Sequence, residues 1–403
     1  MSNQFYRNVV LVGDGIYADI ATCYLANQLR SIGVNLWRVR GLSTLEHPTT
    51  INVDHSIHVL NEDMGFDFNA LMFGGVLSPM LVNSISVLRH TAYFESYLRL
   101  KDDLPVPHHQ VMARLIREGI GAPWWSASPL VALYNANKFH PELHRFYRGD
   151  IRPYGAKINV NAYSETVNSK SRSLGVKSFD ILDLNADVNI NEKLISALHI
   201  DADTILRDAF FIDMTAERRL TRLITKPETI NSDAEQCGFS YSGQPWVGNC
   251  LALGNAAIRL TTSAPVNHVD WLYKSLVRFV DFFPCPARQD ALAKEYNRLQ
   301  NNDNIAIADF IQTYHSLTTK SSRESLSEKL QHRVNLFAES CQLSEDAAGW
   351  AYPDYWPTLM IAAGIVPRYL PRRVQEIPLK YLMDWYNQRL HNIGTIVSRS
   401  YNL

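Results

Sequence analysis

The chain has 403 residues, of which 46% are hydrophobic and 20% are charged, as in a typical soluble globular protein. Lys and Arg number 39 against 40 Asp and Glu, so no global charge would attract nucleic acid or an anionic membrane. No apolar run approaches the roughly 18 residues that span a bilayer, and a strand-like segment begins within ten residues, which predicts neither a membrane helix nor a signal peptide.

Five cysteines lie far apart in the sequence and form no CxxC pair. Their odd number and scattered positions do not fit a disulfide framework, and they favour a reducing, cytoplasmic location. The five are Cys23, Cys237, Cys250, Cys285 and Cys341.

The first 40 residues predict a strand, a glycine-rich turn, a helix and a second strand. Residues 9–12 form a short apolar run that ends at Gly13, as a buried parallel strand should. Apolar residues then recur at helical spacing from Ala18 until Gly33, and residues 34–39 form the second strand-like run. A βαβ unit of this length is the usual opening of a dinucleotide-binding fold.

The turn between the first strand and the helix reads G-D-G-I-Y-A and fits the G-x-G-x-x-G/A fingerprint. Gly13 allows the tight turn, Gly15 allows backbone to approach a pyrophosphate, and Ala18 allows close packing of helix on strand. The amides at the start of the helix would then bind the anion. The pattern predicts a dinucleotide site at these three residues.

Two features weigh against a simple FAD site. A carboxylate should follow the second strand to bind the ribose, yet Arg38 and Arg40 flank Val39 there. Asp14 and Asp19 also place negative charge near the expected pyrophosphate. Two hypotheses stay open: a site in which the arginines pair with a 2′-phosphate, or an inherited turn with surface arginines and no ligand.

The rest of the chain predicts one α/β body with a helical C-terminal part. We expect residues 1–290 to form the dinucleotide-binding fold, with a substrate-side layer inserted at about 79–150, and residues 291–403 to pack on it as helices broken near 364–371. Shorter predicted elements are helices at 50–65, 162–174 and 268–283, strands at 205–212 and 251–253, and a polar loop at 226–245.

Several polar and aromatic groups have a functional and a structural interpretation. Four side chains share one face of the helix predicted at 50–65, but their spacing matches no metal signature, so we predict a solvated face and no metal site; they are Asp54, His55, His58 and Glu62. We expect His108 and His109 at the surface, and Trp124 and Trp125 either against a planar ligand or, more commonly, in a core.

Short motifs spread along the chain resemble, in order, those of the flavin-dependent tryptophan halogenases. The resemblance implies an α/β, doubly wound, Rossmann-like FAD-binding fold of the flavin monooxygenase type, with a reduced substrate layer and a helical C-terminal region. It also implies FAD as cofactor, a small aromatic substrate and a flavin reductase as partner. The matching segments are residues 9–29, 154–176, 211–218 (F-I-D-M-T-A-E-R), 246–257, 282–284, 296–298 (Y-N-R), 309–315 and 364–368.

Together, the glycine fingerprint and the family resemblance predict that the cofactor binds where three of the predicted strands end. The predicted cofactor-binding residues are Gly13, Gly15, Ala18, Arg38, Asp213, Gly254, Asn255 and Ala256.

The reactive centre of that family is not matched. There, reduced FAD and oxygen oxidise a halide, and the hypohalous acid reaches a lysine assisted by a glutamate. The lysine position falls near Met80 and the glutamate position is Ala264, while the Ser-Thr-Gly that cradles halide reads Pro265-Val266-Asn267. The W-x-W-x-I-P segment is absent, and the G-x-G-E-A-T position at residues 47–52 reads H-P-T-T-I-N.

Two functions therefore stay open, and no catalytic residue is assigned. The first is an FAD-binding oxidoreductase in which halogenation itself is not expected. The second is a catalytically inactive relative that acts as a binding or partner protein. Fold-level similarity alone does not choose between them.

Overall fold

The computed structural model describes residues 5–42, 48–87, 90–94, 100–120, 124–148, 152–226, 229–230, 235–319, 326–344 and 355–403. The chain forms two compact units. The first unit contains residues 1–78, 157–262 and 267–304, and the second contains residues 79–156, 263–266 and 305–403. No helix in the described ranges is long and apolar enough to cross a membrane.

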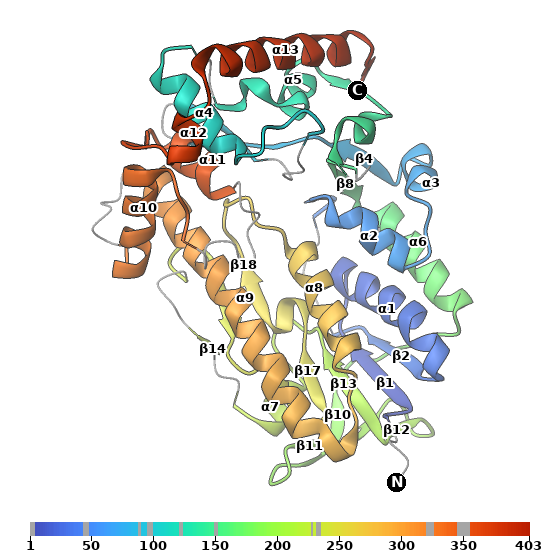
Figure 1. The fold of residues 1–403 in the computed structure, drawn as a ribbon. Coiled ribbons are helices and arrows are strands. Elements are labelled where there is room, and N and C mark those ends of the chain that lie inside the picture. Colours follow the sequence, from blue (N-terminus) through green and yellow to red (C-terminus); the bar gives the residue numbers. More distant parts are fainter. Residues whose placement is uncertain are drawn as a thin grey trace. The chain divides into compact units, whose positions relative to one another are not determined.

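A six-stranded sheet forms the centre of the first unit (Figure 1). Its order is β16 (Trp246–Val247), β17 (Cys250–Ala252), β13 (Ala209–Asp213), β1 (Asn8–Val12), β2 (Asn35–Arg40) and β9 (Lys177–Asp180). All neighbours are parallel except β16 and β17. Because β1 pairs with β2 on one side and β13 on the other, the winding direction reverses there, where such sheets bind ligands.

Three helices of the first unit pack together, with α1 (Ile16–Leu29) between α6 (Val160–Ser173) and α8 (His268–Asp281). Most α1 side chains are buried, as expected for a helix covered on several sides. The helices predicted at 162–174 and 268–283 are confirmed as α6 and α8.

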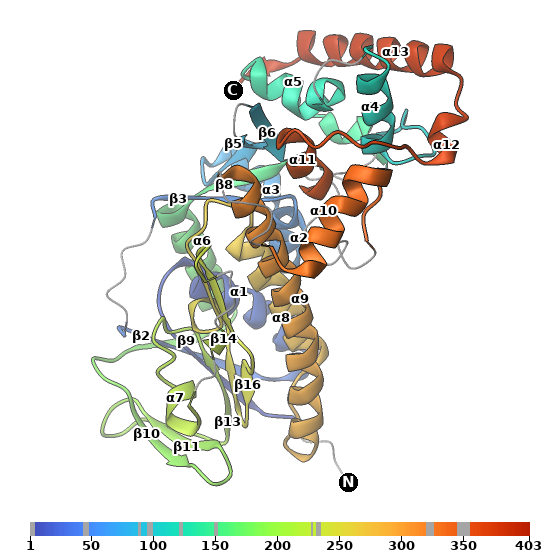
Figure 2. The ribbon, with the colours of Figure 1, turned by 90° about the vertical axis from the view of Figure 1, so that its left-hand side faces the viewer.

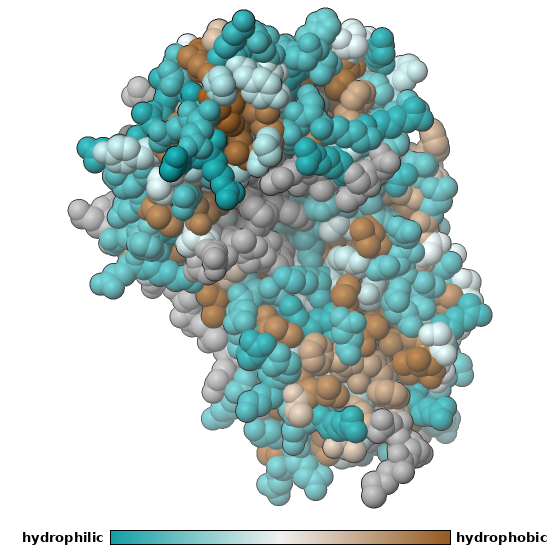
Figure 3. Space-filling view, in the orientation of Figure 1, coloured by the Kyte–Doolittle hydropathy of each residue, from teal (hydrophilic) through white to brown (hydrophobic). Residues whose placement is uncertain are grey.

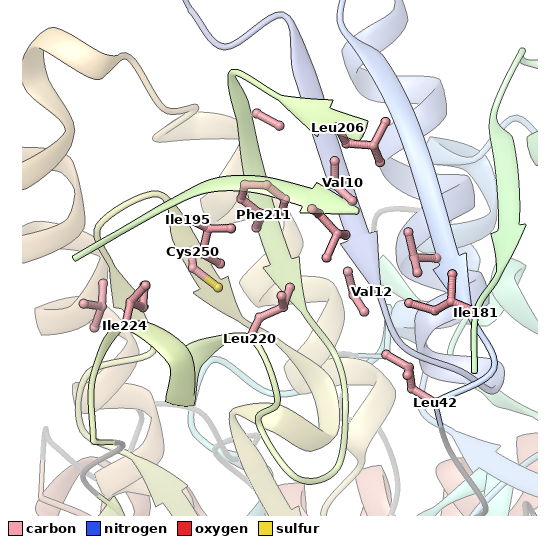
Figure 4. Close-up of a cluster of buried hydrophobic side chains, with 14 residues drawn as sticks. Val10, Val12, Leu42, Ile181, Ile195, Leu206, Phe211, Leu220, Ile224 and Cys250 are labelled. Carbon is pink, nitrogen blue, oxygen red and sulfur yellow. The ribbon is translucent and has the colours of Figure 1, made fainter. Parts of the chain in front are cut away.

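A three-stranded antiparallel sheet contributes to a second core layer of this unit. It contains β10 (Asn185–Asn189), β11 (Leu194–His199) and β12 (Ile205–Arg207). Buried apolar side chains of the central sheet, including Val10 and Phe211, form one cluster with Ile195 of β11 (Figure 4). The buried Asn249 amide donates to the carbonyls of Ile195 and Ala209 and accepts from the Ile195 amide, so its polar atoms are satisfied inside the core.

Three sequence predictions of local structure are wrong in part. The helix predicted at 50–65 begins only at α2 (Ser56–Asp63), because the β-branched run before it forms β3 (Thr50–Val53). The strand predicted at 205–212 is two strands, β12 and β13, separated at Asp208, where φ is 48°. The polar loop at 226–245 contains β14 (Thr229–Ile230) and β15 (Phe239–Ser242), and β15 pairs with β18 (Ile258–Leu260).

Helix α9 (Gln289–Thr318) is tied to the central sheet of the first unit by its first half. The Asn297 side chain accepts from the Trp246 amide and donates to the Trp246 carbonyl, both at 2.9 Å. The Y-N-R motif at 296–298 therefore has a structural role here. Further along α9, Asn304 accepts from the Trp271 indole at 2.8 Å and Asp303 pairs with Arg278 at 2.5 Å, which fixes α8 against α9.

The second unit is mainly helical (Figure 2). The Arg333 guanidinium is buried, lies 4.4 Å from the Trp356 ring centroid and is 3.5 Å from Asp309, so its charge is compensated. The elements of this unit include β5 (Asn83–Val87), β6 (His90–Phe94), α4 (His108–Arg117), α5 (Pro129–Asn135), β7 (Lys138–Phe139), α10 (Glu328–Ser340), α11 (Tyr355–Ala362), α12 (Arg372–Gln375), α13 (Leu379–Ser398) and β19 (Tyr401–Asn402). Unit boundaries fall within β4 (Leu77–Met80), β8 (Gly155–Asn159) and α9, and on both sides of residues 263–266. The short helices α3 (Phe68–Phe73) and α7 (Thr221–Ile224) belong to the first unit.

Several side chains lie in surroundings that the sequence did not indicate. His108 and His109 begin α4 and are not surface residues, because His109 is buried and burial lowers the pKa of His108 well below its usual range. Asp54 and His55 precede α2, so the shared helix face predicted for them does not form. Trp125 packs against the core of the second unit, which favours the structural interpretation of this tryptophan.

The visible surface is mostly hydrophilic (Figure 3). Large apolar side chains that are exposed lie on several different elements or loops of both units, for example Phe73 and Leu182 in the first and Tyr134 and Tyr369 in the second. Single exposed apolar residues are ordinary for a folded protein.

Replacing Asn297 by alanine should destabilise the protein by about 1–3 kcal/mol, because the amide and carbonyl of buried Trp246 lose their partner. Urea denaturation measures the free energy of unfolding. Arg298→Ala is the matched control, since Arg298 is exposed and, among the described residues, pairs with exposed Glu295 one turn earlier, and it should change the stability far less than Asn297→Ala. Equal effects of the two substitutions would contradict this role for Asn297.

Candidate functional site

The loops that follow β1, β13 and β17 are in direct contact at the carboxyl edge of the central sheet. A Cβ atom on Gly13, whose φ is 150°, would lie 2.9 Å from the Met214 main chain. A Cβ on Gly254, whose φ is 53°, would lie 2.7 Å from the Met214 methyl carbon and 3.9 Å from the Tyr17 Cβ. Only glycine fits at Gly13, where the obstacle is main chain, whereas at Gly254 the flexible Met214 methyl could move and the positive φ is what favours glycine. Met214 contacts both loops and forms the centre of this junction.

Helix α1 begins at this edge with free amides. Gly15 precedes the helix at φ 80° and ψ −179°, a region that is essentially restricted to glycine. No side chain in the described part of the chain caps this helix end. The first-turn amides of α1 are therefore available to an anion, and Ala18 is buried as the fingerprint requires.

The two acidic residues near this turn are compensated by the protein itself. The Asp14 carboxylate accepts from the amides of Gly41 and Leu42, both at 2.9 Å. Asp14 therefore binds the loop after β2, where a ribose-binding acid was expected. Asp19 is buried and lies 3.4 Å from the Arg38 guanidinium. The negative charges that weighed against a pyrophosphate are thus paired inside the fold.

Arg38 is not a surface residue. Its side chain is only 2% exposed, and it donates to the Thr22 hydroxyl at 2.8 Å besides pairing with Asp19. Burial lowers its pKa to about 10, so it stays charged at neutral pH. Both terminal nitrogens of this guanidinium are engaged within the protein, while its buried Nε has no partner among the described residues, so a role for Arg38 toward a 2′-phosphate stays a prediction. Arg40 is one-third exposed and lies 3.5 Å from Asp180.

Asp213 is fully buried at the end of β13 and holds the loop that follows it. Its carboxylate accepts from the amides of Thr215, Leu220 and Thr221 and from the hydroxyls of both threonines, at 2.7–3.0 Å. Five hydrogen bonds occupy its lone pairs. Asp213 therefore shapes this edge of the sheet from within.

The predicted second loop of the site forms a single 3₁₀ turn, Gly254–Ala256. Its entry is fixed because the Leu253 amide donates to the Asp213 carbonyl at 2.8 Å. Gly254 and Ala256 are buried, and Asn255 is half-buried. The structure thus brings Gly13, Gly15, Gly254 and their loops together.

Two residues at this edge were missed by the sequence analysis. The Tyr17 ring, in the first turn of α1, stacks on the His268 ring at the start of α8, with centroids 4.1 Å apart and planes 22° from parallel. Burial raises the pKa of Tyr17 and lowers the pKa of His268 to about 4, so both are neutral at pH 7. Tyr17 lies inside the fingerprint, but its partner, about 250 residues away, had no local signal.

The sequence resemblance places the family's reactive centre at Met80 and at residues 264–267, and the structure shows the surroundings of these residues. Met80 ends β4 and is half-buried, and Ala264 is buried. The Val266 amide donates to the Ala264 carbonyl at 2.7 Å. Asn267 caps α8 by accepting from the Val269 amide, and it also donates to the Asn52 carbonyl at 2.5 Å. Of the predicted 47–52 position, residue 47 lies outside the described residues.

A metal is not indicated at this edge. In the described ranges, no group of three or more His, Cys, Asp or Glu side chains is arranged to hold an ion.

Comparison with known proteins identifies the fold. The family model described as tryptophan halogenase matches residues 204–378. No curated protein matches the chain. Solved structures match over nearly the whole length, although identity is low. BrvH, a flavin-dependent halogenase from Brevundimonas sp. BAL3, has a TM-score of 0.87 at 14% identity, over 100% of this chain and 98% of that chain.

Two further structures give the same result. Xcc4156, a flavin-dependent halogenase from Xanthomonas campestris, has a TM-score of 0.85 at 14% identity, with coverage of 99% and 97%. A tryptophan 6-halogenase from Streptomyces toxytricini has a TM-score of 0.77 at 14% identity, with coverage of 98% of each chain. The predicted family resemblance and α/β fold class are therefore confirmed.

Asp213→Asn should destabilise the protein by about 2–4 kcal/mol, because an amide group would face backbone donors that now bind a carboxylate. Asp208→Asn is the matched control: Asp208 is exposed with a positive φ that asparagine tolerates, so its stability should hardly change. Urea denaturation of both variants is the test. A stable Asp213→Asn protein would refute the holding role of this carboxylate.

Proposed function

We propose that this chain, similar to the tryptophan halogenases in its fold and in the family model of residues 204–378, binds FAD and acts as a flavin-dependent oxidoreductase other than a halogenase. One observation carries the proposal: a glycine turn and an uncapped helix end lie where the winding of a parallel sheet reverses. An aromatic substrate and a reductase that supplies reduced flavin belong to the same proposal.

The residues at this edge fit a dinucleotide. Gly13 and Gly15 bring backbone to the ligand, and the free amides of α1 match the charge of a pyrophosphate. The ion pair of Asp19 with Arg38 and the two hydrogen bonds that Asp14 accepts reduce the repulsion that free carboxylates would cause. When bound, FAD would supply the redox chemistry, and the chain would bind it, orient it and exclude water.

Fewer residues at this edge fit the adenosine end of FAD than fit its pyrophosphate. The described residues directly after β2, Gly41 and Leu42, carry no carboxylate, and Asp14 is already bound to their amides. A ribose hydroxyl therefore lacks its usual acceptor at this position. We expect micromolar rather than nanomolar affinity for FAD.

Halogenation is excluded from the proposal by the chemistry of the replaced groups. A thioether at Met80 forms no haloamine, and Ala264 transfers no proton. Pro265 offers no amide to a halide, and the Val266 amide is already bonded. Losing proton transfer and positioning together costs many orders of magnitude in rate.

A second candidate is a catalytically inactive binding protein, and the same replaced groups favour it. The two candidates differ in turnover. An oxidoreductase bound to FAD should consume reductant and transform an added aromatic compound, whereas a binding protein should bind ligand without consuming reductant beyond the rate of free flavin.

Gly15→Val should abolish FAD binding, because a branched side chain would occupy the approach of the pyrophosphate and force the turn from its φ of 80°. Gly33→Val is the matched control: φ there is 71° and nothing lies within 4 Å of an added Cβ. It also places a side chain at a positive φ, in the left-handed helical region (ψ 31°), beyond the other end of α1, where no ligand is expected. FAD titration followed by flavin fluorescence should show loss of binding in Gly15→Val only. Unchanged affinity in a folded Gly15→Val protein would place the site elsewhere.

The protein should form no halotryptophan from free tryptophan, because the lysine, glutamate and halide positions are all replaced. Reduced FAD, oxygen and chloride or bromide are supplied, and the products are analysed by mass spectrometry beside a flavin-dependent tryptophan halogenase as positive control. Product that rises with protein concentration and disappears in Gly15→Val would show that the chain halogenates after all.

A further inference from the structure

His268 has a buried ring nitrogen without a partner at the edge that we propose for FAD. The Nε2 atom is buried and has no hydrogen-bond partner among the residues that the structure describes. A buried polar atom left unpaired costs about 1–3 kcal/mol. Such an atom in a native fold requires an explanation, and a bound ligand is one.

The His268 ring is held against the first turn of α1. Tyr17 stacks on it at 4.1 Å, and Trp271 contacts it edge-on at 6.3 Å between centroids. The Tyr17 Cβ lies 3.9 Å from where a Cβ on Gly254 would be, so Tyr17 contacts the loop after β17. His268 therefore belongs to the same junction as the glycine turn, although it comes from the start of another helix.

The His268 imidazole is neutral in this site. Burial lowers its pKa to about 4, so at pH 7 one ring nitrogen donates and the other accepts. A neutral donor binds a ligand oxygen without adding a charge. This differs from Arg38, which is charged and paired inside the protein.

We propose that His268 contacts the bound dinucleotide directly, with its Nε2–H donating to an oxygen of the ligand, and that Tyr17 positions the imidazole by stacking. The proposal rests on the FAD site proposed above and adds a specific contact to it. His268 is a binding residue, and Tyr17 is a positioning residue. A histidine that served only the core would stabilise the protein without affecting ligand affinity.

Substitution of His268 separates a ligand contact from a core role. His268→Ala should weaken FAD binding about tenfold, as for the loss of one hydrogen bond to an oxygen that carries charge. His268→Gln should keep most of the affinity, because its amide can donate from nearly the same place. His199→Ala is the matched control: this histidine belongs to the same unit, pairs with exposed Asp187, and should leave affinity unchanged.

Substitution of Tyr17 tests the positioning role. Tyr17→Phe keeps the stack and should bind FAD as the wild type does. Tyr17→Ala should weaken binding severalfold, and less than His268→Ala, because the imidazole remains but loses its support. All variants are titrated as full chains by calorimetry, with thermal unfolding recorded without FAD to confirm that each is folded.

A measurement on the unmodified protein keeps the proposal testable if the alanine variants do not fold. Wild-type protein labelled with 15N-histidine should show a shift of the His268 Nε2 resonance when FAD is added, with the resonance assigned by its loss in His268→Gln. No shift at saturating FAD would overturn the contact.

The outcomes distinguish this contact from the FAD site itself. Wild-type protein that binds no FAD would overturn both proposals. Binding that is lost in Gly15→Val and unchanged in folded His268→Ala would overturn the histidine contact alone. Weaker binding in His268→Ala with recovery in His268→Gln would support both.

Discussion

The buried carboxylate of Asp213 determines the shape of the candidate site. It satisfies five donors of the segment that follows β13 and so fixes Met214 between Gly13 and Gly254. Without this support, the amides of Thr215, Leu220 and Thr221 in the loop after β13 would lose their partner, and each such amide costs free energy when it is buried. The residue resembles a ligand-binding acid in sequence, but its lone pairs are used to build the edge.

A related constraint governs the charges of the nucleotide turn. Asp14 and Asp19 are tolerated next to an anion-binding helix end because the fold pairs one with two amides and the other with buried Arg38. A buried ion pair contributes little net stability, but removing one partner would leave an uncompensated charge. Arg38 therefore serves as the counter-ion of Asp19, and this ion pair links β2 to α1. The Asp14 carboxylate, which contacts the loop after β2, is therefore already hydrogen-bonded to the amides of Gly41 and Leu42.

The fold and the reactive groups carry different information about function. The architecture matches flavin-dependent halogenases over almost their whole length at 14% identity, which shows how fully a backbone can be kept while side chains change. Chemistry depends on particular side chains, and where the sequence resemblance places the family's lysine, glutamate and halide cradle, this chain has a thioether, a methyl group and a helix cap. The sheet edge itself has a glycine turn and a neutral, stacked histidine beside it.

The sequence determined the parts of the fold that local periodicity encodes. The apolar run at 9–12, the glycine turn and the helix after it were predicted because a buried parallel strand, a positive φ and a 3.6-residue repeat all leave local signatures. The helices α6 and α8 were predicted for the same reason. Local patterns failed at 50–53 and 205–213, where strand pairing with distant segments decided the structure.

Only the tertiary structure decided which partners the polar side chains have within the protein. Arg38 and Asp213 are predicted as cofactor residues from their places in motifs, and the structure adds that Arg38 pairs with Asp19 and that Asp213 binds the loop from Thr215 to Thr221. His268 was an ordinary helix residue in the sequence, and it gained its significance from Tyr17, which is far away along the chain. A motif specifies the backbone path, whereas the direction and partner of a side chain depend on packing between segments that no local pattern connects.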